Sequence, residues 1–195
     1  AAATLTEVKD IYRPYKQKKK TRASVAVERG LQPLADLILA QDPAADVDAE
    51  AEKYVDEEKG VPTAADAIAG AKDIIAEIVS DDAGVRKKLR NLFMKNGEVV
   101  TRLVNAEQEG AKTYEMYAEF SENVAEIKSH RVLAVNRGEK EGFLKVKVQF
   151  DDTIAKRIAG ASYVKGSGRA SELVREAADD GYAPLIFSSI EREIR

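Results

Sequence analysis

The chain has 195 residues, of which 44% are hydrophobic and 33% are charged, and this length suffices for one compact domain or two small ones. Its 31 basic and 34 acidic side chains leave a formal net charge of −3, which excludes a global positive field that would attract nucleic acid or anionic membranes. Cysteine is absent and His130 is the single histidine, which excludes disulfides, thiolate metal sites and multi-histidine metal centres.

The chain lacks the features that direct a protein to or across a membrane. It has no run of 18 apolar residues, and its first residues, AAAT, resemble neither a signal peptide nor an initiator methionine. The absence of cysteine fits a reducing compartment. We therefore expect a cytoplasmic protein with no membrane partner, excised from a longer chain.

Charge is unevenly distributed along the chain. Residues 9–29 contain eight basic and two acidic side chains, a local balance of +6, whereas residues 42–59 contain eight acidic and two basic ones, a balance of −6. The two segments either neutralise each other in the fold, or the basic one faces a polyanion while the acidic one stays solvated.

Helical spacing of apolar residues predicts four helices before residue 80. Thr4 or Thr6 begins the first, and Pro14 ends it because the residue before a proline avoids helical angles. Thr63 and Asp66 form a capping box at the start of the fourth, which has the most regular apolar stripe. The apolar residues of the four helices are Leu5, Val8, Ile11 and Tyr12; Leu31, Leu34, Ala35, Ile38 and Leu39; Val47, Ala51, Tyr54 and Val55; and Ile68, Ala71, Ile74, Ile75, Ile78 and Val79.

A fifth helix is expected after Asp81 or Asp82, either of which can cap it, and Gly97 can end it. Its apolar residues would face inward and its cations outward. The inward set is Val85, Leu89, Leu92 and Phe93, and the outward set is Arg86, Lys87, Lys88 and Arg90.

The second half of the chain combines strand and helix patterns. Residues 143–150 alternate apolar and polar side chains, which predicts a strand, and the β-branched run 99–104 predicts a second that would pair with it. Helical periodicity resumes over 111–120, where Tyr114 and Tyr117 share one face and are expected in the core. Ser121 and Ser129 resemble helix caps, and further helices are expected near 152–159, 171–180 and 184–195.

These patterns predict a mainly α fold, a multi-helix bundle with a small β element formed by strands near 99–104 and 143–150. We expect residues 1–195 to form one compact unit, with a basic loop at 13–22.

That basic loop is the strongest local signal for a binding function. Its ten residues contain six cations and no acid, and Tyr12 and Tyr15 lie beside them to stack on bases or sugars. The alternative is a solvated turn that keeps an exposed loop soluble, or one that pairs with the acidic segment. The candidate nucleic-acid-binding residues are Arg13, Tyr15, Lys16, Lys18, Lys19, Lys20 and Arg22.

Other constellations point to structure more than to chemistry. Lys165 and Arg169 flank a Gly-Ser-Gly turn before a predicted helix and are reserve candidates for phosphate contact, although the turn lacks the pattern of a nucleotide-binding loop. His130 lies near a helix start, where it can cap or pack. The adjacent acids at 81–82, 151–152 and 179–180 fall at predicted element ends, where capping explains them. We expect no catalytic residue, no metal and no cofactor.

Several stretches, in this order along the chain, resemble the Tex family of bacterial transcription accessory proteins. They are EVKDIYRPYKQKKKTRA at 7–23, ERGLQPLA at 28–35, YVDEEKGV at 54–61, AGAKDIIAE at 69–77, EGAK at 109–112, SHR at 129–131 and NRGEKEG at 136–142. The resemblance spans residues 5–195, and the alanines at 1–3 depart from it.

The resemblance implies a fragment of a longer protein. Tex proteins continue into an RNase H-like domain, helix-hairpin-helix motifs and a C-terminal OB-fold domain that binds RNA, whereas this chain matches their helical N-terminal region. It implies a non-catalytic role in transcription, with weak and nonspecific binding of RNA or DNA. Other implied partners are the remaining Tex domains and RNA polymerase or other transcription proteins. Two alternatives stay open, a purely structural module and a protein-interaction module that uses an exposed apolar face.

Overall fold

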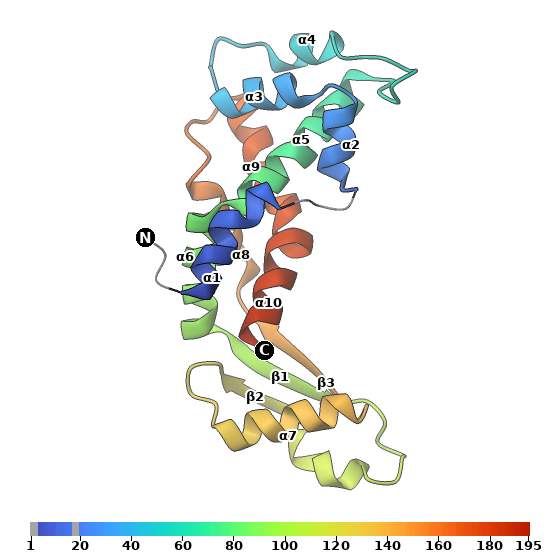
Figure 1. The fold of residues 1–195 in the computed structure, drawn as a ribbon, viewed down its shortest axis with the longest axis vertical. Coiled ribbons are helices and arrows are strands. Elements are labelled where there is room, and N and C mark those ends of the chain that lie inside the picture. Colours follow the sequence, from blue (N-terminus) through green and yellow to red (C-terminus); the bar gives the residue numbers. More distant parts are fainter. Residues whose placement is uncertain (1–3, 17–19) are drawn as a thin grey trace. The chain divides into compact units, whose positions relative to one another are not determined.

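The computed structural model describes residues 4–16 and 20–195 (Figure 1). Contacts divide the chain into two compact units: the first falls within Ala1–Leu89 and Thr153–Ile190, and the second is Arg90–Asp152 with Glu191–Arg195. The expectation of one compact unit thus differs from the structure, which has the other organisation that the chain length allows. Each unit buries apolar side chains of its own elements, which is what makes it compact.

The first unit is helical. The division between the units falls within α6 (Ala83–Asn96) and α10 (Ser188–Ile194). The remaining elements of this unit are α1 (Leu5–Tyr12), the 3-10 turn η1 (Arg13–Tyr15), α2 (Arg22–Glu28), α3 (Gln32–Ala40), α4 (Val47–Glu52), α5 (Ala64–Asp81), α8 (Asp152–Ala161), α9 (Arg169–Gly181) and the π-helical η3 (Tyr182–Phe187). The five helices predicted before residue 97 are confirmed, and α2, which sequence analysis left within a loop, is an addition.

Helix α5 is the centre of this unit and contacts α2, α3, α4 and α9. Its capping box forms as predicted, because the Thr63 hydroxyl accepts a hydrogen bond of 3.1 Å from the Asp66 backbone N–H. Ile75 and Val79 are fully buried. At Gly70 a Cβ atom would lie 2.3 Å from Leu31 Cδ1, so this helix needs glycine where Leu31 packs against it.

Helix α1 differs from α5 in the face that it buries. Thr4 caps it, since its hydroxyl accepts a hydrogen bond from the Glu7 backbone N–H. The side chains of its apolar stripe are exposed, with Leu5 at 71% and Ile11 at 56%, whereas Asp10 is only 4% exposed. This helix therefore places a carboxylate, and not its apolar stripe, against its neighbours.

The second unit contains a three-stranded antiparallel sheet of order β2-β1-β3, formed by β1 (Glu98–Leu103), β2 (Glu119–Asn123) and β3 (Leu144–Gln149). The two predicted strands pair as expected, with Thr101 opposite Val146. Strand β2 was missed. The helix predicted over 111–120 is the 3-10 helix η2 (Ala111–Tyr117), and Ser121 lies within β2, so its assignment as a cap is wrong.

The core of the second unit lies between one face of this sheet, η2 and α7 (Ser129–Lys140). Tyr114 and Tyr117 are buried in it, which confirms the predicted core role, and the Tyr117 and Phe120 rings meet edge to face with centroids 5.4 Å apart. Phe120 reaches the core from a strand as readily as from a helix, which explains the wrong period assigned there. The mainly α fold with a small β element is confirmed.

Within the described parts of the chain, no helix combines the length and the apolar character needed to cross a bilayer.

Candidate functional site

Of the four cations of the basic segment 13–22 that the structure describes, two contact acids of α5. Arg13 Nε donates a hydrogen bond of 2.9 Å to Asp81 Oδ1, and Arg22 Nε lies 3.5 Å from Asp73 Oδ1. The Arg13 side chain is 33% exposed and that of Asp81 only 9%. Arg13 therefore ties its end of the segment to α5 and offers little of its charge to solvent, whereas the Arg22 side chain is 72% exposed beside its partner.

Three further residues of the segment face solvent. Tyr15 is 79% exposed, and Lys16 and Lys20 are exposed and form no ion pair with another described residue. Lys18 and Lys19 lie outside the described residues. Tyr15, Lys16 and Lys20 thus have the exposure that a contact with a polyanion requires.

The acidic segment 42–59 does not neutralise the described part of the basic segment. Glu50 pairs with Lys53, and Asp56 with Lys59, within their own turns. These contacts raise the pKa of Lys53 and Lys59 and lower that of Asp56, chiefly through the side-chain hydrogen bonds. No ion pair joins residues 42–59 to residues 13–16 or 20–22, so mutual neutralisation of the two segments finds no support among the contacts described.

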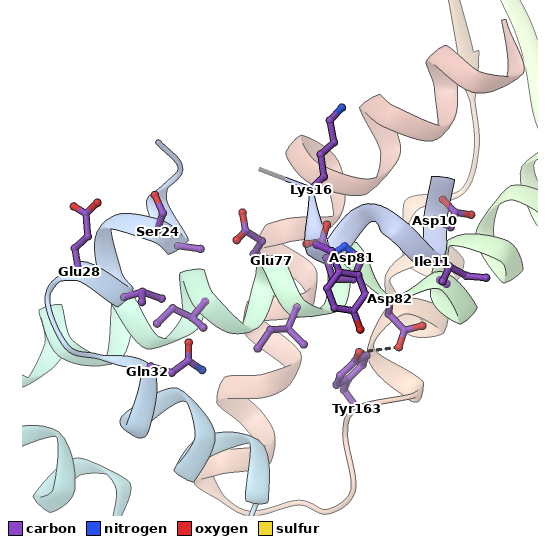
Figure 2. Close-up of a pocket in the computed structure, with 17 residues that line it drawn as sticks. Asp10, Ile11, Lys16, Ser24, Glu28, Gln32, Glu77, Asp81, Asp82 and Tyr163 are labelled. Carbon is purple, nitrogen blue, oxygen red and sulfur yellow. Dashed lines mark hydrogen bonds between the residues drawn. The ribbon is translucent and has the colours of Figure 1, made fainter. Parts of the chain in front are cut away.

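A groove of about 910 Å³ borders the basic segment and is lined by residues of α1, η1, α2 and α5 (Figure 2). Its apolar lining includes Pro14, Val27 and Ile78, and five carboxylates also line it: Asp10, Glu28, Glu77, Asp81 and Asp82. In Figure 2 the Lys16 side chain points away from those of Glu77 and Asp81. The groove is therefore unsuited to phosphate, and the cations beside it are usable only from their solvent side.

Two lining residues of this groove are joined by a hydrogen bond of 2.8 Å from the Tyr163 hydroxyl to Asp82 Oδ2 (Figure 2). Burial and this bond to a carboxylate raise the pKa of Tyr163. Asp82 also accepts from the Val85 backbone N–H at 2.7 Å and so caps α6, as the sequence predicts. Asp82 thus has structural partners on two sides.

Helix α1 is held beside the groove by a buried ion pair. Arg86 is fully buried, and its Nε donates to Asp10 Oδ1 at 2.8 Å while its Nη2 donates to Ser189 Oγ at 3.0 Å. The prediction that Arg86 faces outward is wrong, because its guanidinium is the partner that Asp10 requires for burial. At the surface, Lys87 Nζ also pairs with Glu7 at 2.7 Å.

The reserve candidates Lys165 and Arg169 lie in and just after a turn that Gln41 holds. The Gln41 side-chain carbonyl accepts from the Lys165 backbone N–H and from Ser171 Oγ, both at 2.8 Å, and its amide donates to the Tyr163 carbonyl at 2.6 Å. Arg169 Nε lies 3.6 Å from Asp48 Oδ2. Lys165 and Arg169 remain exposed, and the turn itself serves to join α8 and α9 to the end of α3.

A second groove, which sequence analysis did not single out, is lined by the cations Lys156, Arg157 and Arg175 of α8 and α9. A signal was present, because residues 156–175 contain five cations and one acid. It was missed because the cations are spread over two helices and an intervening turn, so no short run of charge reveals them.

The other candidate residues, His130 and the acidic side chains, do not come together in a site among the described residues. His130 is exposed on the first turn of α7. Across residues 4–16 and 20–195, no group of three or more histidine, aspartate or glutamate side chains is arranged to hold a metal ion.

Comparison with known proteins gives the family. A family model described as Tex central region-like matches residues 42–195. The chain is 44% identical over 193 residues to the uncharacterized protein YdcI of Bacillus subtilis, an alignment that covers 98% of this chain and 27% of that protein. It is 40% identical over 155 residues to the transcriptional accessory protein Tex of Neisseria gonorrhoeae, covering 78% of this chain and 20% of that protein.

A more distant similarity, 28% identity over 210 residues, links the chain to the S1 RNA-binding domain-containing protein 1 of Pongo abelii and covers 98% of this chain and 20% of that protein. The chain thus spans about a fifth to a quarter of the length of these curated relatives. Because the family model matches most of its residues, and the resemblance read from its motifs agrees, the chain belongs to the Tex family.

Proposed function

We propose that this chain acts as a non-catalytic helical scaffold of a Tex-type transcription accessory protein and adds an accessory, sequence-nonspecific contact to RNA or DNA. The observation that carries the proposal is the solvent-facing group Tyr15, Lys16 and Lys20, in a segment with six cations and no acid. The names of two relatives, a transcriptional accessory protein and an S1 RNA-binding domain-containing protein, support it.

In the proposed contact, the segment has a residue that fixes its position on the fold and residues that bind the nucleic acid. Arg13 anchors the segment to α5 through Asp81. Four lysines then neutralise phosphates while Tyr15 stacks on a base or sugar. Such contacts carry no base code, so we expect affinity with little sequence discrimination. The four lysines are Lys16, Lys18, Lys19 and Lys20.

Fluorescence-anisotropy titration of labelled single-stranded RNA and duplex DNA over a salt series tests this proposal. Four lysines on a single strand give an expected log–log salt slope of about −3, because each neutralised phosphate contributes about −0.7. The variant Lys18→Glu, Lys19→Glu, Lys20→Glu should lose most of the binding and flatten the slope.

A matched control carries the same charge change on exposed lysines of the second unit, Lys112→Glu, Lys128→Glu and Lys140→Glu. Circular dichroism first establishes that both variants are folded. Equal loss of binding in the two variants would reduce the effect to net charge, and no binding by the unmodified chain at low salt would remove the nucleic-acid role.

A protein-interaction module is the second candidate, favoured by the exposed apolar stripe of α1. Leu5, Val8, Ile11 and Tyr12 are 71%, 49%, 56% and 60% exposed, and stripes of this kind often mark protein contacts. The partner would be RNA polymerase, another transcription protein or the remaining Tex domains. Binding to purified RNA polymerase that persists after nuclease treatment, and that Val8→Asp with Ile11→Asp abolishes, would favour it.

A further inference from the structure

The groove between α8 and α9 has a charge and shape different from those of the groove beside the basic segment. Its volume is about 490 Å³, within the range of sites that hold small ligands. Three of its lining side chains are cationic and one, Asp179, is acidic. The groove beside the basic segment has five carboxylates and one cation, Lys16, among its lining residues, so the α8–α9 groove is the one suited to an anion.

The cations of this groove are not used by the fold. Arg13, Lys72 and Arg86, elsewhere in the first unit, each have a carboxylate within 3.1 Å. Among the described residues, Lys156, Arg157 and Arg175 form no ion pair, and Asp179 forms none either, although it lies four residues after Arg175 on α9. Their charges are therefore available to a ligand.

The helical spacing of α8 explains how the cations come to share one wall. Lys156 and Gly160 are four residues apart, as are Arg157 and Ala161, so each cation lies one turn before a small residue on the same face. Gly160, Ala161 and Val164 supply a wall with short side chains, and Arg175 faces it from α9. A ligand can therefore approach the helix backbone closely while both helices offer cations to it.

From this arrangement we propose that the α8–α9 groove binds the sugar-phosphate backbone of a single-stranded nucleic acid. Lys156, Arg157 and Arg175 contact phosphates, and the sugars lie against Ala161 and Val164. The volume suits one or two nucleotide units, which a single strand presents individually and a duplex does not. The proposal takes nucleic acid as the ligand from the proposed function but uses different residues, so the two stand or fall separately.

The experiment combines affinity measurement with direct mapping of the contact. A single-stranded oligonucleotide that carries 4-thiouridine is photo-crosslinked to the folded chain, and the crosslinked peptides are identified by mass spectrometry. Crosslinks are expected within residues 153–164 and 169–181. In anisotropy titrations, Lys156→Glu, Arg157→Glu, Arg175→Glu should weaken binding at least tenfold and make the salt slope less negative by about 2, the share of three phosphates.

The control triple variant of the second unit, Lys112→Glu, Lys128→Glu and Lys140→Glu, should bind as the unmodified chain does. If the charge-reversed groove does not fold, Lys156→Gln, Arg157→Gln, Arg175→Gln replaces it, with a smaller loss expected in the same direction. Crosslinks confined to residues 7–22, with no loss in the groove variants, would overturn this inference and leave the basic segment as the contact. Binding of an acidic peptide in place of the oligonucleotide would overturn it as well.

Loss in the groove variants together with full binding by Lys18→Glu, Lys19→Glu, Lys20→Glu would instead support the groove and overturn the contact proposed for the basic segment.

Discussion

Helices α1 and α5 are both amphipathic, yet they face opposite ways. Helix α5 buries its apolar stripe, with Ile75 and Val79 inaccessible to solvent. Helix α1 leaves its stripe exposed and buries Asp10, which Arg86 pairs with at 2.8 Å. The period of apolar residues therefore predicts that a helix forms, whereas the partners on neighbouring elements decide which of its faces is buried.

The energetic basis of the two contacts also differs. Burying an Ile or Val side chain stabilises a fold by about 1.5–3 kcal/mol, with no requirement for a particular partner. A buried ion pair contributes little net stability, because desolvation offsets the Coulomb attraction, but loss of one partner is costly. Helix α5 therefore depends on packing, and α1 depends on complementarity with Arg86.

The largest effect is expected from Asp10→Ala. It deprives the buried Arg86 of a carboxylate and should lower the free energy of unfolding by about 4 kcal/mol, measured by urea denaturation. Hydrogen exchange should show α1 losing protection first. The apolar double variant Asp10→Leu, Arg86→Met should recover most of the stability; if it is as unstable as Asp10→Ala, the ion pair is not the cause.

Ile75→Ala tests whether apolar packing stabilises α5. Ile75 is fully buried in α5, and removal of its side chain leaves a cavity, so the free energy of unfolding should fall by about 3 kcal/mol. Denaturant titration measures this loss. A change below about 1 kcal/mol would mean that α5 is not the packing centre of its unit.

Tyr163→Phe tests the polar contact at the carboxyl end of α5. Loss of the bond to Asp82 should cost about 1.5 kcal/mol near neutral pH. Because the folded-state pKa of Tyr163 is raised, its contribution is complete below the unfolded-state pKa of about 10 and falls as pH rises above it.

Urea titrations near pH 7 and near pH 11 should therefore show the gap between Tyr163→Phe and the unmodified chain shrinking at alkaline pH. A gap that is constant or widens would contradict the assigned sign.

The smallest effect is expected from Ile11→Ser. Ile11 is 56% exposed on α1, so the free energy of unfolding should change by less than about 0.5 kcal/mol. Thermal and urea unfolding measure it, with Ile75→Ala as the buried counterpart. A loss above 1 kcal/mol would place the apolar stripe of α1 in a packed interface and remove the contrast between the two helices.

The same contrast explains how far the binding residues were predictable. A run of cations identifies the segment 13–22, but a run does not distinguish Arg13, which pairs with Asp81, from Lys16, which has no ion-pair partner among the residues that the structure describes. Arg175 joins Lys156 and Arg157 only because α8 and α9 lie beside one groove. The cations of segment 13–22 could be identified because they are close in the sequence, whereas those of the α8–α9 groove could not.

By itself, the sequence determined the elements whose signal is local. The Thr63 capping box and the apolar stripe of α5, the alternation of β3 and the core face carrying Tyr114 and Tyr117 were all predictable, because caps and periodicity act within a few residues. The ordered motifs also determined the family, since several blocks in the same order are far more specific than any one of them.

Only the tertiary structure decided what depends on contacts across long separations. Asp10 and Arg86 are 76 residues apart in the sequence. Because they pair, α1 buries the side that carries Asp10, and Arg86, predicted at the surface, is buried. Strand β2 forms because β1 pairs with residues that read locally as helix, and the grouping of Lys156 and Arg157 with Arg175 depends on the placement of two helices. The physical reason is the same in all three cases. Burial and pairing are stabilised by contacts with residues that are distant in the sequence, and the local pattern of residues does not identify those partners.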